Sequence, residues 1–218
     1  MGAKYKNLLF DLDGTLTDSG EGITNSVRNA LNYFKIEVNS EEELRRFVGP
    51  PLRDSFRKFY NFNEEETTLA VEKFREYFRE KGMFENKVYE GMDKLLDELH
   101  KNGTKTFVTT SKPEEFATKI LEHFNLEKYF TYIHGATMDL SVSKKEQIIG
   151  YTIKQHNLKL EETIMIGDRA EDIIGAHENH IDSIGVLYGY GDYEELSEVK
   201  PTYIVKDVKE LSELLYKY

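Results

Sequence analysis

Two carboxylates stand directly after a short apolar run near the N-terminus. Residues 8–10 read LLF, and Asp11, Leu12, Asp13 and Gly14 follow. An apolar run of this kind is typical of a strand buried on both faces of a parallel sheet, and side chains two residues apart on a strand point the same way. Asp11 and Asp13 are therefore expected to project together from the strand end. Their mutual repulsion favours a bound cation such as Mg²⁺.

An Asp-Gly pair between apolar runs is also typical of a hairpin turn. From this stretch alone, a turn at Asp13-Gly14 and an active site at Asp11 and Asp13 both stay open. Open α/β sheets bind ligands at the carboxyl ends of their strands. The functional interpretation therefore depends on the residues at the ends of the later strands.

One later strand ends in hydroxyls. Phe107-Val108 runs into Thr109, Thr110 and Ser111. These residues suit a helix start, and helix N-termini also bind phosphate, so both interpretations fit.

Another strand ends in acids, and a pair of lysines precedes a further helix. Residues 164–166 run into Gly167 and Asp168. Asp168 is either a helix N-cap or a third acid facing the first two, which requires a cation to be tolerated. Lys144 and Lys145 are either surface charges or the source of the positive charge that a phosphate needs.

The 218 residues suffice for one large domain or for a core with an inserted smaller unit. Residues 18–82 show helical periodicity throughout, whereas strand and helix patterns alternate from residue 83 onward. Alternating strands and helices predict a parallel sheet with helices on both faces. We therefore expect an α/β fold, with a Rossmann-like three-layer core from residues 1–17 and 83–218. Residues 18–82 are expected to form an α-helical cap.

Composition excludes several classes. The net charge is −11 and no basic patch is evident, which argues against nucleic-acid binding and against anionic lipid surfaces. No apolar run reaches membrane-spanning length, and no signal peptide is evident. Cysteine is absent, which excludes disulfides and thiolate chemistry. Together these features predict a cytoplasmic protein.

Four signatures in order resemble the haloacid dehalogenase superfamily of phosphohydrolases. They are DLDGT at residues 11–15, a strand ending in Thr110, a lysine before a helix, and GDRAED at residues 167–172. The resemblance covers the whole chain. The helical insert is similar to the family's small α-helical cap, and the phosphoglycolate-phosphatase-like branch is the most similar.

The resemblance implies catalytic roles for individual residues. Asp11 would be the nucleophile that forms an aspartyl-phosphate, and Asp13 would protonate the leaving oxygen and then take a proton from water. Thr110 and the amide of Ser111 would bind the phosphoryl group. Lys144 would offset the charge on Asp11 and the phosphate; Lys145 is the rival, and Lys144 is preferred for its spacing to the following helix.

The resemblance also implies a metal and a specificity loop. Mg²⁺ would be held by Asp11, the backbone carbonyl of Asp13 and Asp168, with Asp172 behind them or joined through water. Gly49 and Arg53 would belong to a substrate-facing cap loop, although an ordinary interhelical turn and a surface arginine explain them equally well.

The predicted function is Mg²⁺-dependent hydrolysis of a small phosphate monoester, such as phosphoglycolate or a nucleoside 5′-monophosphate. Asp13 stands where the family's dehalogenases carry Tyr, which favours phosphoryl chemistry. A sugar phosphomutase or phosphotransferase using the same intermediate is the alternative, although Ile23 stands where such mutases carry His. A non-catalytic phospho-ligand binder is the third hypothesis. The particular ester and the oligomeric state stay open.

Overall fold

The computed structural model describes residues 4–139 and 141–217. The chain divides into two compact units, one of Met1–Asp18 with Val88–Tyr218 and one of Ser19–Lys87. The ends of the predicted core, residues 1–3 and 218, lie outside the described part.

The first unit is built on a six-stranded sheet in the order β5-β4-β1-β6-β7-β8. Its strands are β1 (Asn7–Phe10), β4 (Lys105–Pro113), β5 (Tyr132–Ala136), β6 (Thr163–Gly167), β7 (Asp182–Val186) and β8 (Tyr203–Val205). Every neighbouring pair is parallel, which confirms the predicted α/β fold class. Since β1 lies between β4 and β6, the hairpin interpretation of Asp13-Gly14 is wrong.

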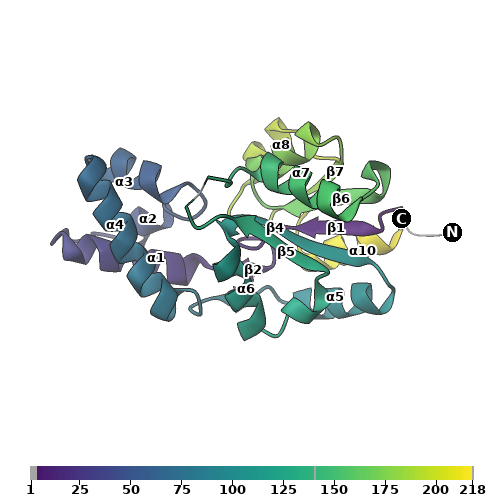
Figure 1. Cartoon of the computed structure of the whole chain (residues 1–218), viewed down its shortest axis with the longest axis horizontal. Coiled ribbons are helices and arrows are strands. Elements are labelled where there is room, and N and C mark those ends of the chain that lie inside the picture. Colours follow the sequence, from purple (N-terminus) through teal and green to yellow (C-terminus); the bar gives the residue numbers. More distant parts are fainter. Residues whose placement is uncertain (1–3, 140, 218) are drawn as a thin grey trace. The chain divides into compact units, whose positions relative to one another are not determined.

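Helices cover both faces of this sheet (Figure 1). Helices α7 (Lys145–His156) and α8 (Ala170–Glu178) lie on one face, and α5 (Met92–Lys101), α6 (Glu114–His123) and α10 (Val208–Lys217) on the other. The short helix α9 (Tyr193–Glu198) and 3₁₀ turns at Glu127–Tyr129 and Leu160–Glu162 complete the unit.

The apolar core beneath α7 and α8 orients the end of β1. Leu9 is fully buried there, opposite Phe107 on β4 and Met165 on β6, and it packs in one cluster with Ile149 of α7. Because side chains alternate along a strand, Asp11 leaves the sheet on the same side as Leu9. The buried strand thus delivers this carboxylate toward the first turns of α7 and α8.

The second unit is helical. It contains α1 (Gly20–Tyr33), α2 (Glu41–Arg45), α3 (Leu52–Tyr60), α4 (Glu64–Tyr77) and a π-helical turn at Phe78–Gly82. Ser40 caps α2 by accepting from Glu43 N, and Asn63 with Glu66 forms a capping box on α4. The chain passes between the units through the short paired strands β2 (Thr17–Asp18) and β3 (Lys87–Val88).

The helical unit ends at Lys87, later than the predicted boundary at Gly82. Glu85 is the cause, because its backbone carbonyl accepts from Gly22 N at 2.9 Å. The Glu85 carboxylate also accepts from Asn25 Nδ2 and Tyr77 OH, both at 2.9 Å. These bonds tie the segment after the π-helical turn to α1 and α4.

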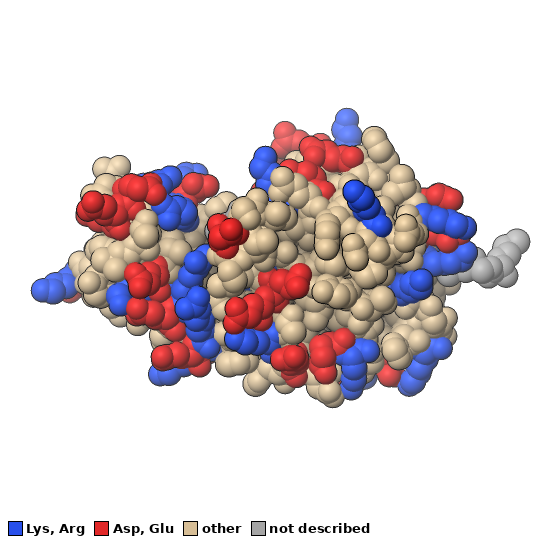
Figure 2. All heavy atoms as spheres, viewed as in Figure 1, with Lys and Arg blue, Asp and Glu red and all other residues tan. Residues whose placement is uncertain are grey.

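Charged side chains of both signs are interspersed on the face shown in Figure 2. Within the two described ranges, no helix combines the length and the apolar character that crossing a bilayer requires.

Candidate active site

The carboxyl end of β1 is held by backbone bonds and then turns sharply. Asp11 N donates to Ile166 O at 2.9 Å, and Asp11 Oδ1 accepts from Leu12 N–H at 2.8 Å. Gly14 lies in the turn with φ of +80°, and a Cβ there would stand 2.1 Å from Asp168 Oδ2. Glycine is thus required both by the backbone conformation and by the close approach of the Asp168 carboxylate, which follows the neighbouring strand β6.

Three buried carboxylates meet at this edge. Asp11, Asp168 and Asp172 each offer an oxygen, and these oxygens lie within 4.8 Å of one another. Asp168 follows β6 and is fully buried; Asp172 lies in the first turn of α8. The Tyr190 N–H donates to Asp168 Oδ2 at 2.8 Å, and the Thr15 hydroxyl to Oδ1 at 3.3 Å. Burial, followed by the charges of Asp172 and Asp11, raises the pKa of Asp168 to about 8.

A buried lysine compensates part of this charge. Lys145 Nζ lies 2.8 Å from Asp11 Oδ1 and 2.7 Å from Asp172 Oδ1, and it donates to Thr109 O at 3.0 Å. Burial alone would lower the pKa of this ammonium group, but the charges of Asp11 and Asp172 raise it above its usual value. Burial also raises the pKa of Asp172 to about 7. The two neighbouring carboxylates thus outweigh burial at Lys145, whereas burial dominates at Asp172.

The structure places Lys145 at the acidic cluster, and not Lys144, which was preferred from the sequence. The Lys144 side chain is 73% exposed, and its ion-pair partner is Glu146 at 3.9 Å. Lys145 is the first residue of α7, and it lies one helical turn before the fully buried Ile149. The face of α7 that packs on the sheet therefore carries Lys145 inward, whereas Lys144 precedes the helix.

The remaining core residues predicted for the site lie at the same edge, outside the acidic cluster. Asp13 Oδ2 lies 2.9 Å from Lys112 Nζ, a lysine that was not predicted from the sequence. Thr110 is buried near the end of β4 and its hydroxyl accepts from Lys112 N at 3.2 Å. Ser111 is exposed. Since β4 is parallel to β1 with Val108 opposite Phe10, these residues follow at the sheet edge that carries Asp11.

The two predicted cap residues belong to the helical unit. Gly49 has a φ of +105°, which suits a turn before α3. Arg53 pairs with Glu64, and its guanidinium nitrogens lie 3.4 Å from the Thr68 hydroxyl. The Arg53 guanidinium is therefore engaged within its own unit, and the role of this loop stays a prediction.

The donor set of the acidic cluster fits a hard divalent cation. Carboxylate oxygens are the ligands that Mg²⁺ prefers, and the cluster carries more negative charge than its one lysine balances. A bound cation would offset both the burial and the like-charge repulsion that raise the pKa of Asp168.

One family model matches most of the chain. The family described as haloacid dehalogenase-like hydrolase matches residues 8–186. The chain belongs to this family. It is 41% identical to a 5′-nucleotidase from Pseudomonas aeruginosa, over 97% of this chain and 96% of that protein. It is 28% identical to a phosphoglycolate phosphatase from Vibrio parahaemolyticus, over 96% of each.

The chain is also similar to a protein named as a kinase and to a solved structure of a predicted phosphatase. The tyrosine-protein kinase PtkA of Mycobacterium tuberculosis is 34% identical, over 95% of this chain and 72% of that protein. The crystal structure of a predicted phosphatase from Clostridium acetobutylicum superposes on this chain with a TM-score of 0.91. The two sequences are 50% identical, and the match covers 98% of this chain and 99% of that one. The predicted family and the predicted class of enzyme, a phosphatase of the haloacid dehalogenase type, are confirmed.

Proposed function

We propose that the chain hydrolyses a small phosphate monoester through an aspartyl-phosphate formed on Asp11. The observation that carries this proposal is the place of the Asp11 carboxylate, 2.8 Å from Lys145 Nζ and beside Asp168 and Asp172 at a parallel sheet's carboxyl edge. The ammonium group of Lys145 contacts this carboxylate and offsets its charge, and the carboxylate oxygens are the nucleophile that attacks phosphorus.

The reaction runs in two steps. A carboxylate oxygen of Asp11 attacks phosphorus, the bond from phosphorus to the ester oxygen breaks, and Asp13 gives that oxygen a proton. Water then attacks the phosphorus of the aspartyl-phosphate, Asp13 takes its proton, and inorganic phosphate leaves with Asp11 restored. The Thr110 hydroxyl and the Ser111 N–H hold phosphoryl oxygens, and Lys145 offsets their charge.

Asp11, Asp168 and the backbone carbonyl of Asp13 would hold Mg²⁺, with Asp172 next to them. When bound, the ion supplies charge neutralisation for the phosphoryl group and orients it. Without it, the ammonium group of Lys145 would face three carboxylates and a phosphate dianion.

A nucleoside 5′-monophosphate is the favoured substrate class. The support is the 41% identity, over nearly the whole of both chains, to a protein named 5′-nucleotidase. Phosphoglycolate is the next candidate, at 28% identity. The helical unit of residues 19–87 is proposed as the cap that selects the leaving group, since the residues at the sheet edge serve only the phosphoryl group and the ester oxygen, which all phosphate monoesters share.

Transfer to another acceptor is the second candidate. It is favoured by the 34% identity to a protein named as a tyrosine kinase. The same Asp11 intermediate would then pass its phosphoryl group to a hydroxyl in place of water.

The test measures free phosphate from a panel of nucleotides, phosphoglycolate and sugar phosphates, with Mg²⁺ and with chelator. The native chain is compared with Asp11→Asn and with the control Asp97→Asn, whose exposed side chain pairs with Lys101 on α5. We expect Mg²⁺-dependent release that only Asp11→Asn abolishes. Loss of the ester without free phosphate would favour transfer, and turnover by Asp11→Asn equal to that of the native chain would overturn the nucleophile.

A further inference from the structure

The end of β4 departs from regular strand geometry. β4 pairs with β5 up to Thr110 opposite Gly135, and pairing resumes with Pro113 opposite Ala136. Ser111 and Lys112 therefore have no counterparts on β5, which is the arrangement of a β-bulge. A bulge of this kind re-aims the side chains that it carries.

The bulge brings Lys112 against two residues of the candidate site. Its Nζ lies 2.9 Å from Asp13 Oδ2, and its backbone N–H donates to the Thr110 hydroxyl at 3.2 Å. The Lys112 side chain is 7% exposed, so its charge is withdrawn from water. A buried ammonium group is tolerated only beside a fixed partner of opposite charge, and here Asp13 is such a partner.

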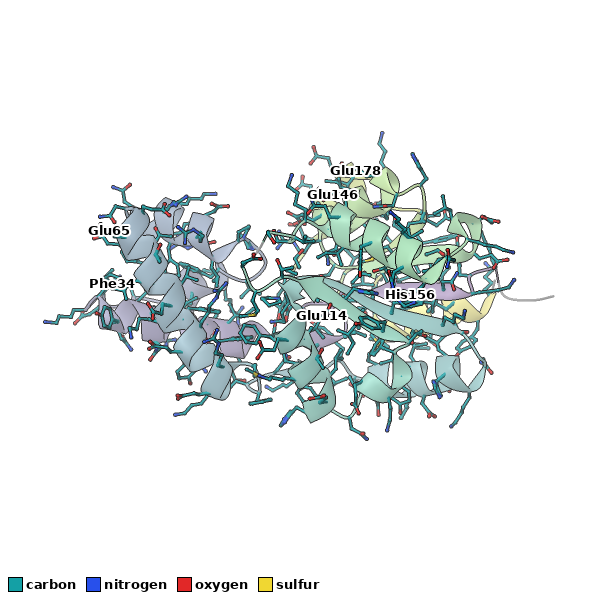
Figure 3. All side chains as sticks on the ribbon, viewed as in Figure 1. Phe34, Glu65, Glu114, Glu146, His156 and Glu178 are labelled. Atoms are coloured by element: carbon teal, nitrogen blue, oxygen red, sulfur yellow. The ribbon has the colours of Figure 1, made fainter. Side chains whose placement is uncertain are left out.

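Gly135 makes room for the bulge. A Cβ at this position would stand 2.6 Å from Lys112 O and equally close to the backbone of Glu114. Gly135 N also donates to Glu114 Oε2 at 3.3 Å, at the start of α6 (Figure 3). The bulge is therefore built into the fold by β5 and α6.

Only one oxygen of Asp13 is occupied by this contact. Asp13 Oδ2 faces Lys112, whereas Oδ1 is buried and accepts no hydrogen bond from residues 4–139 or 141–217. Lys145 is meanwhile held by Asp11 and Asp172. Each acid of the DLDGT motif thus has its own buried lysine: Lys145 contacts Asp11, and Lys112 contacts Asp13.

We propose that Lys112 is a positioning residue for Asp13, which it aims at the leaving group and away from the acidic cluster. This inference rests on the proposed phosphatase function. As the bond from phosphorus to the ester oxygen breaks, the proton of the Asp13 carboxyl group passes to that oxygen, and the Lys112 ammonium stabilises the carboxylate that remains.

The test uses two esters whose leaving groups need protonation to different extents. A nucleoside 5′-monophosphate leaves as an alkoxide and needs the proton, whereas p-nitrophenyl phosphate leaves as a stable phenolate. We compare kcat and KM for the native chain, Lys112→Met, Lys112→Arg, Asp13→Asn and the control Lys119→Met. Lys119 is an exposed lysine on α6 that pairs with Glu115.

We expect Lys112→Met to lower kcat for the nucleotide by about 10²-fold, the lower range for general acid catalysis, and for p-nitrophenyl phosphate by less than about 10-fold. Asp13→Asn should lower both rates, and the nucleotide rate more, because it also removes the base for the water that attacks the aspartyl-phosphate formed from either ester. Lys112→Arg should recover part of the nucleotide rate, and Lys119→Met should leave both rates unchanged. The ratio of the two kcat values does not depend on the folded fraction, so partial unfolding cannot produce this result.

Equal loss of kcat on both esters, loss confined to KM, or no loss would overturn the role of Lys112 while hydrolysis by the native chain stands. Failure of the native chain to release phosphate from either ester with Mg²⁺ would instead overturn the proposed function itself.

Discussion

The ammonium group of Lys145 lies 2.8 Å from Asp11 Oδ1, and both side chains are buried. This contact joins the first residue of α7 to the end of the central strand. It provides the positive charge that the acidic sheet edge needs, and it does so from a helix face that also packs the core.

Replacing Lys145 should therefore be far more damaging than replacing its neighbour. We expect Lys145→Met to lower kcat/KM by about 10²-fold or more, because it removes the charge that faces both the nucleophile and the phosphoryl group. Lys144→Met should change kcat/KM by less than about 3-fold, since its side chain is 73% exposed. Steady-state kinetics on the ester that the native chain hydrolyses would decide. Equal effects would argue against the assignment of Lys145.

Magnesium should stabilise the folded chain through the acidic cluster. A ligand that binds only the folded state at 100 times its Kd raises the free energy of unfolding by about 2.7 kcal/mol. We expect Mg²⁺ to raise the thermal midpoint of the native chain and to have little effect on Asp168→Asn, which loses one of the three buried carboxylates. Differential scanning calorimetry with Mg²⁺ and with chelator measures this. A Mg²⁺ shift that survives in Asp168→Asn would place the ion elsewhere.

Gly14→Ala should damage both stability and the site. The φ of +80° disfavours any side chain, and the new Cβ would collide with Asp168 Oδ2. Gly103→Ala is the matched control, because its φ is +74° and nothing lies within 4 Å of the added Cβ. We expect Gly103→Ala to lower the free energy of unfolding by about 1 kcal/mol with activity intact. Gly14→Ala should also abolish turnover and Mg²⁺ binding. Urea unfolding, calorimetric titration and kinetics separate the two effects, and an active Gly14→Ala would show that the site tolerates the collision.

The chain should lose stability as the pH falls below neutrality, in part through His134. Burial, followed by the proximity of His156, lowers the pKa of His134 from 6.5 to about 4. His134 Nε2 lies 3.0 Å from His156 Nε2 at the end of α7 (Figure 3), and the rings of Tyr132 and Tyr151 pack against it. As the pH falls, the unfolded chain therefore binds a proton at His134 before the folded chain does. The contribution of neutral His134 to the free energy of unfolding is complete above about pH 6.5 and is lost as the pH falls toward 4.

His134→Gln removes this titration. We expect the urea midpoint of the native chain to fall between pH 7.5 and pH 5, and that of His134→Gln to fall less. His177→Gln, an exposed position on α8, serves as the control and should keep the native pH dependence. The assignment is wrong if His134→Gln retains the full native slope.

Part of the site could be predicted because it depends on local pattern. The apolar run before Asp11, the run before Asp168 and the change from helical to alternating periodicity near residue 83 are properties of neighbouring residues. Parallel strands deliver their carboxyl ends to one edge, so placing the acids of β1 and β6 together needed only the fold class. Helix periodicity also carries a signal for Lys145, which lies at i−4 from Ile149, whereas the spacing to the following helix favours Lys144.

The sequence by itself determined the α/β fold class, the family and which acids follow the buried strands. These features depend on short contiguous patterns of residues. The tertiary structure alone decided which partners those acids have. Lys112 reaches Asp13 through a bulge that depends on Gly135, and Tyr190 N–H reaches Asp168 from a loop after β7. Likewise, residues 83–87 join the helical unit through Glu85. These contacts join residues far apart in the chain, and no local periodicity encodes them.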